Sequence, residues 1–357
     1  MKKKIFYSLN IFILILFILS IDFTLSKIFY KKDHCFNFQY FKNGHYYDLK
    51  KNCKSKYRFK SGFPTVNFYT NNLGLRVSDQ IKNEKNDLKK NIFLFGDSFT
   101  FGVGLEYENT YAGLLEKKLS KYNFYNFAVG SYSPTVHFYR LNQAINNGLI
   151  PDKIILFLDL TDVIDESQRW FFDQNLKLPI RPEDRIDTKK TFFKENFKLT
   201  YDLINMMRYS TRFIKDNFKD QKINIKTSIQ GQFTYTEIEK LDKRFWKKND
   251  LKNGLNKIEL NLNKISKLAK KKNSELYLVV YPWAETLFYG QKNLNWSNFA
   301  NKICMKNNCI TIDAFPSFEK YKLENKNWHR KLYFIGDEHF NKEGAKLLAE
   351  TVLKKIF

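Results

Sequence analysis

The segment NIFLFGDSFTFGVG, residues 91–104, places an acid and a serine directly behind an apolar run. The run from Ile92 to Phe95 stops at Gly96, Asp97 and Ser98. A continuous apolar stretch that ends at a glycine is typical of a buried strand, with Ser98 at its tip. A serine hydroxyl becomes a strong nucleophile only when a neighbouring base takes its proton. The alternative is that Ser98 merely caps the next helix, a position that serine favours.

A base of the right kind occurs near the C-terminus, in the segment GDEHFNKEG, residues 336–344. Asp337 and His339 stand just ahead of the final helical pattern, 241 residues after Ser98. The imidazole of His339 can remove the serine proton, and Asp337 can hold the ring in the tautomer that this transfer needs. The presence of a base and its orienting acid favours the nucleophile over the helix cap for Ser98.

Alternating strands and helices must bring these distant residues together. Strands are expected at 91–96, 123–129, 153–160, 275–283 and 309–315, and helices at 110–122, 135–148, 254–272 and 341–356. This alternation predicts a three-layer α/β/α fold around a five-stranded, mainly parallel sheet of flavodoxin-like type. Ligands of such sheets bind beyond the carboxyl ends of the strands, which is where Ser98 is expected.

The two motifs together resemble those of the SGNH hydrolase superfamily, also called the GDSL lipase/esterase family. The resemblance covers residues 88–162 and 275–357. Gly96-Asp97-Ser98 matches the first block of that family, and Asp337-Glu338-His339 matches the last block in the D-x-H form of its glycan O-acetyl esterases and acyltransferases. The resemblance implies that Ser98, His339 and Asp337 are the catalytic residues.

The family's remaining blocks imply the donors to an oxyanion. The backbone N–H of Ser98 is one donor, and the loop NFAVGSYS places Ser131, or Gly130 after a shift by one residue, at the second. In the third block the family uses an Asn, where this chain has Thr161. Removing one such donor typically slows catalysis by about 10²–10³-fold. Asp97 and Asp162 are expected to have supporting, structural roles.

The N-terminus predicts a membrane anchor. Lys2, Lys3 and Lys4 precede an almost entirely apolar run from Ile5 to Phe23, which is close to the ~20 residues that span a bilayer. Positive charge ahead of the run keeps that end in the cytoplasm, and no A-x-A cleavage pattern follows. We therefore expect an uncleaved, single-pass signal anchor over residues 1–26 in the inner (cytoplasmic) membrane, with a cleaved signal peptide as the alternative.

The rest of the chain then lies on the periplasmic, extracytoplasmic side. We expect an extension over residues 27–87 and a catalytic domain over 88–357. An aromatic and basic insertion at about 165–250 is too long for a simple crossover and is expected to lie over the edge of the sheet. An even number of cysteines in an exported chain permits two disulfides, Cys35–Cys53 and Cys304–Cys309, with four buried free thiols as the alternative.

Composition limits the partners. The formal net charge is +24, but the lysines are scattered and no nucleic-acid-binding motif accompanies them, so nucleic acid is not expected as a partner. The cysteine spacings do not match a zinc site, and neither a metal nor a cofactor is predicted.

These features predict a membrane-anchored, extracytoplasmic serine esterase or O-acyltransferase that acts on acyl, and specifically acetyl, esters of a glycan. The sequence leaves open whether water or a second hydroxyl accepts the acyl group. Two alternatives remain: a non-catalytic glycan-binding or assembly protein on the same fold, and an esterase directed at lipids.

Overall fold

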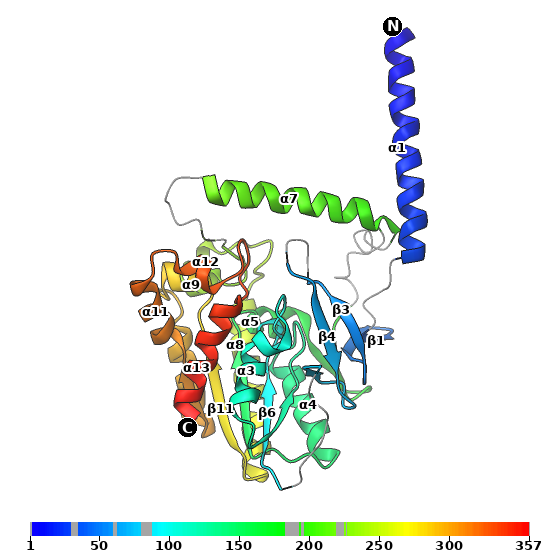
Figure 1. Cartoon of the computed structure of the whole chain (residues 1–357). Coiled ribbons are helices and arrows are strands. Elements are labelled where there is room, and N and C mark those ends of the chain that lie inside the picture. The colour runs from blue at the N-terminus through cyan, green and yellow to red at the C-terminus, as the bar shows by residue number, and fades with distance from the viewer. Residues whose placement is uncertain are drawn as a thin grey trace.

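The computed structural model describes residues 2–29, 35–59, 63–79, 88–182, 193, 196–218, 225 and 227–356 (Figure 1). A single apolar helix rises away from a body built around one central sheet. The disulfides Cys35–Cys53 and Cys304–Cys309 both form, which are the two pairs expected from the sequence.

The central sheet has five strands, all parallel. They are β6 (Asn91–Phe95), β7 (Asn123–Asn126), β8 (Lys153–Leu158), β11 (Glu275–Val280) and β12 (Ile310–Asp313), in the spatial order β12-β11-β8-β6-β7. The chain begins this sheet near the middle, at β6, and reverses direction once, which is the flavodoxin-like order. The predicted fold class is therefore confirmed, and the sheet is wholly parallel.

Several predicted strands were too long at their carboxyl ends. The pairing of β6 with β7 ends at Asn126. The pairing of β8 with β11 ends where Leu158 lies opposite Val280. The residues that follow, such as Phe127 and Leu160, are nevertheless buried. Apolar character continued past the hydrogen-bonded ladder because the loops at this edge are themselves packed into the core.

Helices cover both faces of the sheet (Figure 1). On one face α3 (Tyr111–Lys118) packs against α13 (Lys342–Ile356), and on the other α4 (Pro134–Asn146) and α10 (Trp296–Asn307) both pack against α8 (Asp250–Lys271). Shorter helices occupy the catalytic edge and its surroundings: α2 (Ser98–Phe101), α5 (Asp162–Ile164), α9 (Ala284–Tyr289), α11 (Phe315–Glu324) and α12 (Trp328–Leu332).

The N-terminal extension forms two small antiparallel sheets against the body. The first pairs β1 (Phe36–Phe41) with β2 (Gly44–Leu49), and the second joins β3 (Lys54–Tyr57), β4 (Val66–Thr70) and β5 (Arg76–Val77). Aromatic side chains of the extension, including Tyr46 and Tyr47, share a buried cluster with Tyr132 and Trp170 of the catalytic domain. The extension therefore packs as part of the same body.

The insertion divides into parts with different surroundings. The hairpin of β9 (Phe171–Asp173) and β10 (Leu178–Ile180) lies beside the extension, through a bridge between His45 and Arg181. Phe233 and Trp246 are buried in the main core. Helix α7 (Lys198–Phe218) instead packs against the N-terminal helix α1 (Lys2–Phe29). It also runs crosswise over the top of the body (Figure 1), and the expectation that the insertion lies over the edge of the sheet stays a prediction.

Within α1, residues Leu9–Ile28 have the length and apolar composition of a membrane span, with a mean hydropathy of 2.3 and little burial inside the protein. Length and composition alone also fit a signal sequence.

Candidate active site

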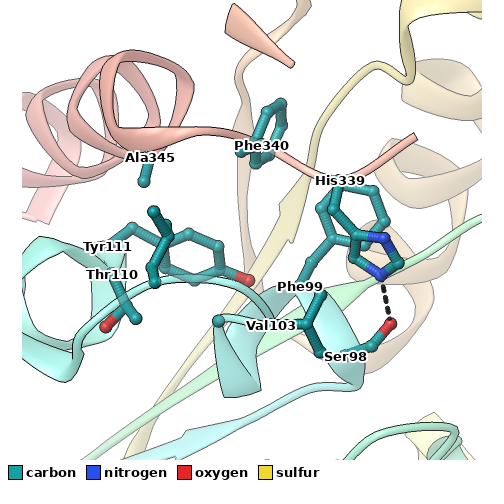
Figure 2. Close-up of a pocket in the computed structure, with 10 residues that line it drawn as sticks. Ser98, Phe99, Val103, Thr110, Tyr111, His339, Phe340 and Ala345 are labelled. Atoms are coloured by element: carbon teal, nitrogen blue, oxygen red, sulfur yellow. Dashed lines mark hydrogen bonds between the residues drawn. The ribbon is translucent and has the colours of Figure 1, made fainter. Parts of the chain in front are cut away.

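Ser98, His339 and Asp337 meet at the carboxyl edge of the sheet. Ser98 Oγ lies 2.8 Å from Nε2 of His339 (Figure 2). The other ring nitrogen, Nδ1, lies 2.5 Å from Asp337 Oδ1. The same Asp337 oxygen accepts the backbone N–H of His339 at 3.0 Å. The D-x-H spacing therefore lets one carboxylate oxygen hold both the loop backbone and the ring, and the three groups stand in the order nucleophile, base and orienting acid.

A tight turn presents Ser98. A Cβ on Gly96 would lie 1.9 Å from Thr100 Oγ1, so only glycine fits between the strand and the helix. Asp97 then caps α2, and its carboxylate accepts the backbone N–H of Phe99 at 2.9 Å. Ser98 is the first residue of the short helix, so its backbone N–H needs no helical partner and is free to face a ligand. The predicted supporting role of Asp97 corresponds to this cap.

Arg76, from the extension, holds the other end of the same helix. Its guanidinium is buried and donates to the carbonyl oxygens of Phe101, of Gly102 at 2.9 Å and of Leu105 at 2.6 Å. Phe101 and Gly102 form the C-terminus of α2, where helix carbonyls lack intrahelical partners, and Leu105 follows in the next turn of the chain. Burial lowers the pKa of Arg76 to about 10, because removal of the guanidinium from water disfavours its charged form. Arg76 thereby fixes α2, which carries Ser98, against the extension.

The imidazole of His339 is enclosed by aromatic rings. The ring centroid of Phe99 lies 4.6 Å away and that of Phe59, from the extension, lies 5.3 Å away. His339 is only 5% exposed. Such packing limits the ring to one orientation, in which Nε2 points at Ser98.

The loop that carries Gly130 and Ser131 passes directly beside the nucleophile. A Cβ on Gly130 would lie 3.9 Å from Ser98 Cβ, and Ser131 has a φ of 60°, a left-handed conformation that is uncommon for serine. Within the described part of the chain neither residue's backbone N–H donates to an acceptor. Two unengaged N–H groups close to a nucleophile suit the role of oxyanion donor, which for Ser131 or Gly130 stays a prediction.

Two aromatic side chains hold this loop from behind. Tyr47, in β2, donates its hydroxyl to the carbonyl oxygen of Gly130 at 2.8 Å, and Trp170 donates its ring N–H to that of Ser131 at 2.6 Å. Because both carbonyls are tied down, the attached peptide units are restrained in the strained conformation. The sequence did not reveal this role, since Tyr47 lies in the extension and Trp170 at the start of the insertion.

Thr161 lies near the site but already has a partner. The Thr161 hydroxyl lies 2.7 Å from Asp159 Oδ1 and 3.4 Å from Asp97 Oδ2. The same Asp97 oxygen lies 3.3 Å from Ser98 Oγ. A hydroxyl has one proton to donate. Thr161 would therefore have to exchange Asp159 for an oxyanion, and its predicted role as third donor stays a prediction.

Besides Asp337, the acids Asp97, Asp159 and Asp162 are buried at this edge. Burial raises the pKa of each, and for Asp97 and Asp162 the charges of neighbouring aspartates raise it further. Asp162 has the structural role expected, since its Oδ2 accepts the backbone N–H of Asp159 at 2.8 Å.

His137 lies inside the domain and cannot serve as a second base. It is fully buried, its Nε2 lies 3.3 Å from the carbonyl oxygen of Gly96, and burial lowers its pKa to about 3. A neutral ring in this position braces the turn in front of Ser98.

A small cavity touches the reacting groups. It has a volume of about 10 Å³ and is lined by Ser98, Phe99 and His339 on one side and by Thr110, Tyr111 and Ala345 on the other (Figure 2). A cavity of this size holds about one water molecule.

Asp337, Glu338 and His339 also have oxygen and nitrogen atoms within 4.8 Å of one another, close enough to share a metal ion. Both ring nitrogens of His339 are hydrogen-bonded, however, to Asp337 and to Ser98. The observed contacts are those of a proton-transfer chain, and a metal would have to displace them.

No protein-family model matches the chain, and no curated protein matches it in sequence. Solved structures with a similar fold exist. The acetyl xylan esterase AlAXEase aligns with a TM-score of 0.41 and 16% identity, over 75% of this chain and 100% of that one. TesA aligns with a TM-score of 0.41 and 12% identity, over 75% of this chain and 98% of that one. A member of the lipolytic protein G-D-S-L family from Veillonella parvula aligns with a TM-score of 0.40 and 14% identity, over 74% and 97%.

Alignments with TM-scores below 0.5 and identities this low carry no argument about this chain, so its chemistry is argued from its own residues.

Proposed function

We propose that this protein is a membrane-anchored, extracytoplasmic serine esterase or O-acyltransferase that acts on short acyl esters, specifically acetyl esters of a glycan. The observation that carries the proposal is the 2.8 Å contact between Ser98 Oγ and His339 Nε2, with Asp337 on the opposite ring nitrogen. A helix cap alone does not require a buried histidine and acid aligned behind the serine hydroxyl.

In this mechanism Ser98 Oγ attacks the ester carbonyl carbon while His339 Nε2 takes the hydroxyl proton. The carbonyl oxygen becomes an oxyanion that accepts hydrogen bonds from the backbone N–H groups of Ser98 and of Gly130 or Ser131. His339 then returns the proton to the departing alkoxide, which leaves an acyl-serine. Water or an acceptor hydroxyl attacks the acyl-serine and gives its proton to His339, and the proton finally returns to Ser98.

The D-x-H motif, which resembles that of glycan O-acetyl esterases, supports a short acyl group. The small cavity beside Ser98 is not lined by Gly130, Ser131 or Thr161 and does not limit the length of the acyl chain. An enzyme of this kind should cleave p-nitrophenyl acetate in preference to p-nitrophenyl octanoate. A clear preference for the octanoate would instead favour the lipid-directed esterase.

The location is supported by the apolar helix and the cysteines. Leu9–Ile28 is long enough to span a membrane, and Lys2–Lys4 would stay on its cytoplasmic side. The remainder would then lie in the oxidising periplasm, where disulfides such as Cys35–Cys53 and Cys304–Cys309 persist.

A fluorophosphonate probe tests the enzyme directly, because it phosphorylates only an activated serine. The full-length protein should be labelled, and Ser98→Ala and His339→Gln should each abolish the labelling. Ser120→Ala, an exposed serine outside the site, is the matched control and should be labelled normally. Absence of labelling in the folded wild-type protein would favour a non-catalytic glycan-binding protein.

A further inference from the structure

Helix α7 exposes an apolar stripe that no described part of the protein covers. Leu199, Leu203, Met206 and Met207 are each about half exposed, at 51–56%. At 3.6 residues per turn these four positions fall within about 100° of the helix circumference, which is the width of an amphipathic apolar face. Arg208 is also exposed and falls on the opposite side of the helix from Met206.

The first turn of α7 is fastened to α1. The carboxylate of Asp22 accepts the backbone N–H of Leu199 at 3.0 Å and that of Thr200 at 2.8 Å, and the hydroxyl of Ser26 accepts that of Lys198 at 2.8 Å. Asp22 and Ser26 are buried at this junction. Three N–H groups that a helix normally leaves unsatisfied are therefore bonded to side chains of α1, which fixes the corner between the two helices.

The position of this corner along α1 matches one face of a bilayer. Lys4 and Asp22 are 18 residues apart, which at 1.5 Å per residue corresponds to about 27 Å of helix. The hydrocarbon core of a bilayer is about 30 Å thick. If the lysines stay in the cytoplasm, Asp22 and the start of α7 reach the opposite interface. Figure 1 shows that α1 rises away from the body at this corner, while α7 runs crosswise to it over the top of the body.

We propose that α7 lies in the headgroup region of the same membrane, with Leu199, Leu203, Met206 and Met207 immersed at its acyl boundary. This inference rests on the membrane anchoring in the proposed function. An amphipathic helix of this kind sinks its apolar face about 5–10 Å into that boundary. Arg208 suits anionic headgroups, whereas Lys198 is paired with Asp202.

Such a helix would set the orientation of the catalytic domain. Helices α5 and α9, which follow the carboxyl ends of β8 and β11, lie on the side of the sheet that faces α7 (Figure 1). Ser98 stands at that same edge of the sheet. With α1 and α7 both in the membrane, the domain cannot tumble about its anchor, and the edge that carries Ser98 faces the bilayer surface.

The four cysteines of the chain are all in disulfides, so one introduced cysteine can be labelled selectively. The full-length protein is reconstituted in vesicles of phosphatidylcholine and phosphatidylglycerol, with the environment-sensitive dye NBD at a single position. The test positions are Leu203→Cys and Met206→Cys, and Arg208→Cys is the matched control on the other side of α7. Ile15→Cys, in the middle of α1, reports whether the anchor spans the membrane. Circular dichroism checks that each variant is folded.

Nitroxide lipids should quench the dye at 203 and 206 at least about twofold more than at 208, and aqueous iodide should show the reverse order. If nitroxide lipids quench the dye at position 15 while iodide quenches the dyes at 203 and 206, then α1 spans the membrane but α7 does not lie in it, and the inference about α7 is overturned. Protection of 203 and 206 from both quenchers also overturns it, because the stripe would then be covered by protein, such as a second copy. If the dye at 15 is itself quenched by iodide, the membrane anchoring of the proposed function is what fails.

Discussion

Removal of the Tyr47 hydroxyl should slow catalysis without touching any reacting group. Tyr47→Phe deletes the 2.8 Å hydrogen bond to the carbonyl oxygen of Gly130 and leaves the aromatic packing in place. The peptide units of Gly130 and Ser131 are then held from behind by Trp170 alone. Because Ser131 has a positive φ, the loop has a strained conformation from which it can relax.

The size of the effect follows from the lost bond to Gly130, because the hydroxyl's contact with Arg181 is long, at 3.5 Å, and does not touch the loop. An intramolecular hydrogen bond contributes about 1 kcal/mol net. If all of it serves to keep the loop in the conformation that receives the oxyanion, kcat falls about fivefold, since about 1.4 kcal/mol corresponds to tenfold. KM should stay nearly constant, because the oxyanion forms only in the transition state. The free energy of unfolding should fall by a similar ~1 kcal/mol.

The assay is steady-state hydrolysis of p-nitrophenyl acetate at a temperature where both proteins are fully folded, with thermal unfolding measured in parallel. Tyr46→Phe is the matched control, since its hydroxyl contacts Tyr132 and Asp48 rather than Gly130. The reasoning is refuted if Tyr47→Phe lowers stability but leaves kcat unchanged, or if Tyr46→Phe lowers kcat as much. In either case Tyr47 would hold the extension in place and nothing more.

Two further predictions concern Thr161 and Glu116. Thr161→Val should lower the free energy of unfolding by about 1–3 kcal/mol, because Asp159 loses the 2.7 Å bond from the hydroxyl, whereas Thr161→Ser should retain it. If Thr161 is also an oxyanion donor, the rate of acetyl ester hydrolysis should fall about tenfold or more, and an unchanged rate would exclude that role. Burial raises the pKa of Glu116 to about 7, so between about pH 4.5 and 7 the folded protein holds a proton that the unfolded chain has released. This group's contribution to the free energy of unfolding is therefore lost as pH rises through that window. Chemical denaturation at several pH values should show that the free energy of unfolding of Glu116→Gln declines less steeply over that range than that of the wild-type protein. An equally steep decline would assign the pH dependence to other groups.

The sequence was sufficient for the elements that depend on local pattern. The apolar run before Gly96 and the helical spacing of residues 341–356 predicted a strand and a helix that the structure contains. Residue type alone made Ser98 and His339 candidates, because few side chains can act as an activated nucleophile and its base. Parallel topology then placed them at one edge of the sheet, since ligand sites of such folds lie beyond the carboxyl ends of the strands.

The sequence was not sufficient for the groups that hold these residues in place. Arg76, Tyr47 and Phe59 belong to an extension with no catalytic motif, and each reaches the site through contacts between residues far apart in the chain. The exposed stripe of α7 was also hidden, because its apolar residues could equally have faced the core. Local periodicity shows which residues of an element share a face. Only the tertiary structure decides what that face meets, because that choice depends on how distant segments pack together.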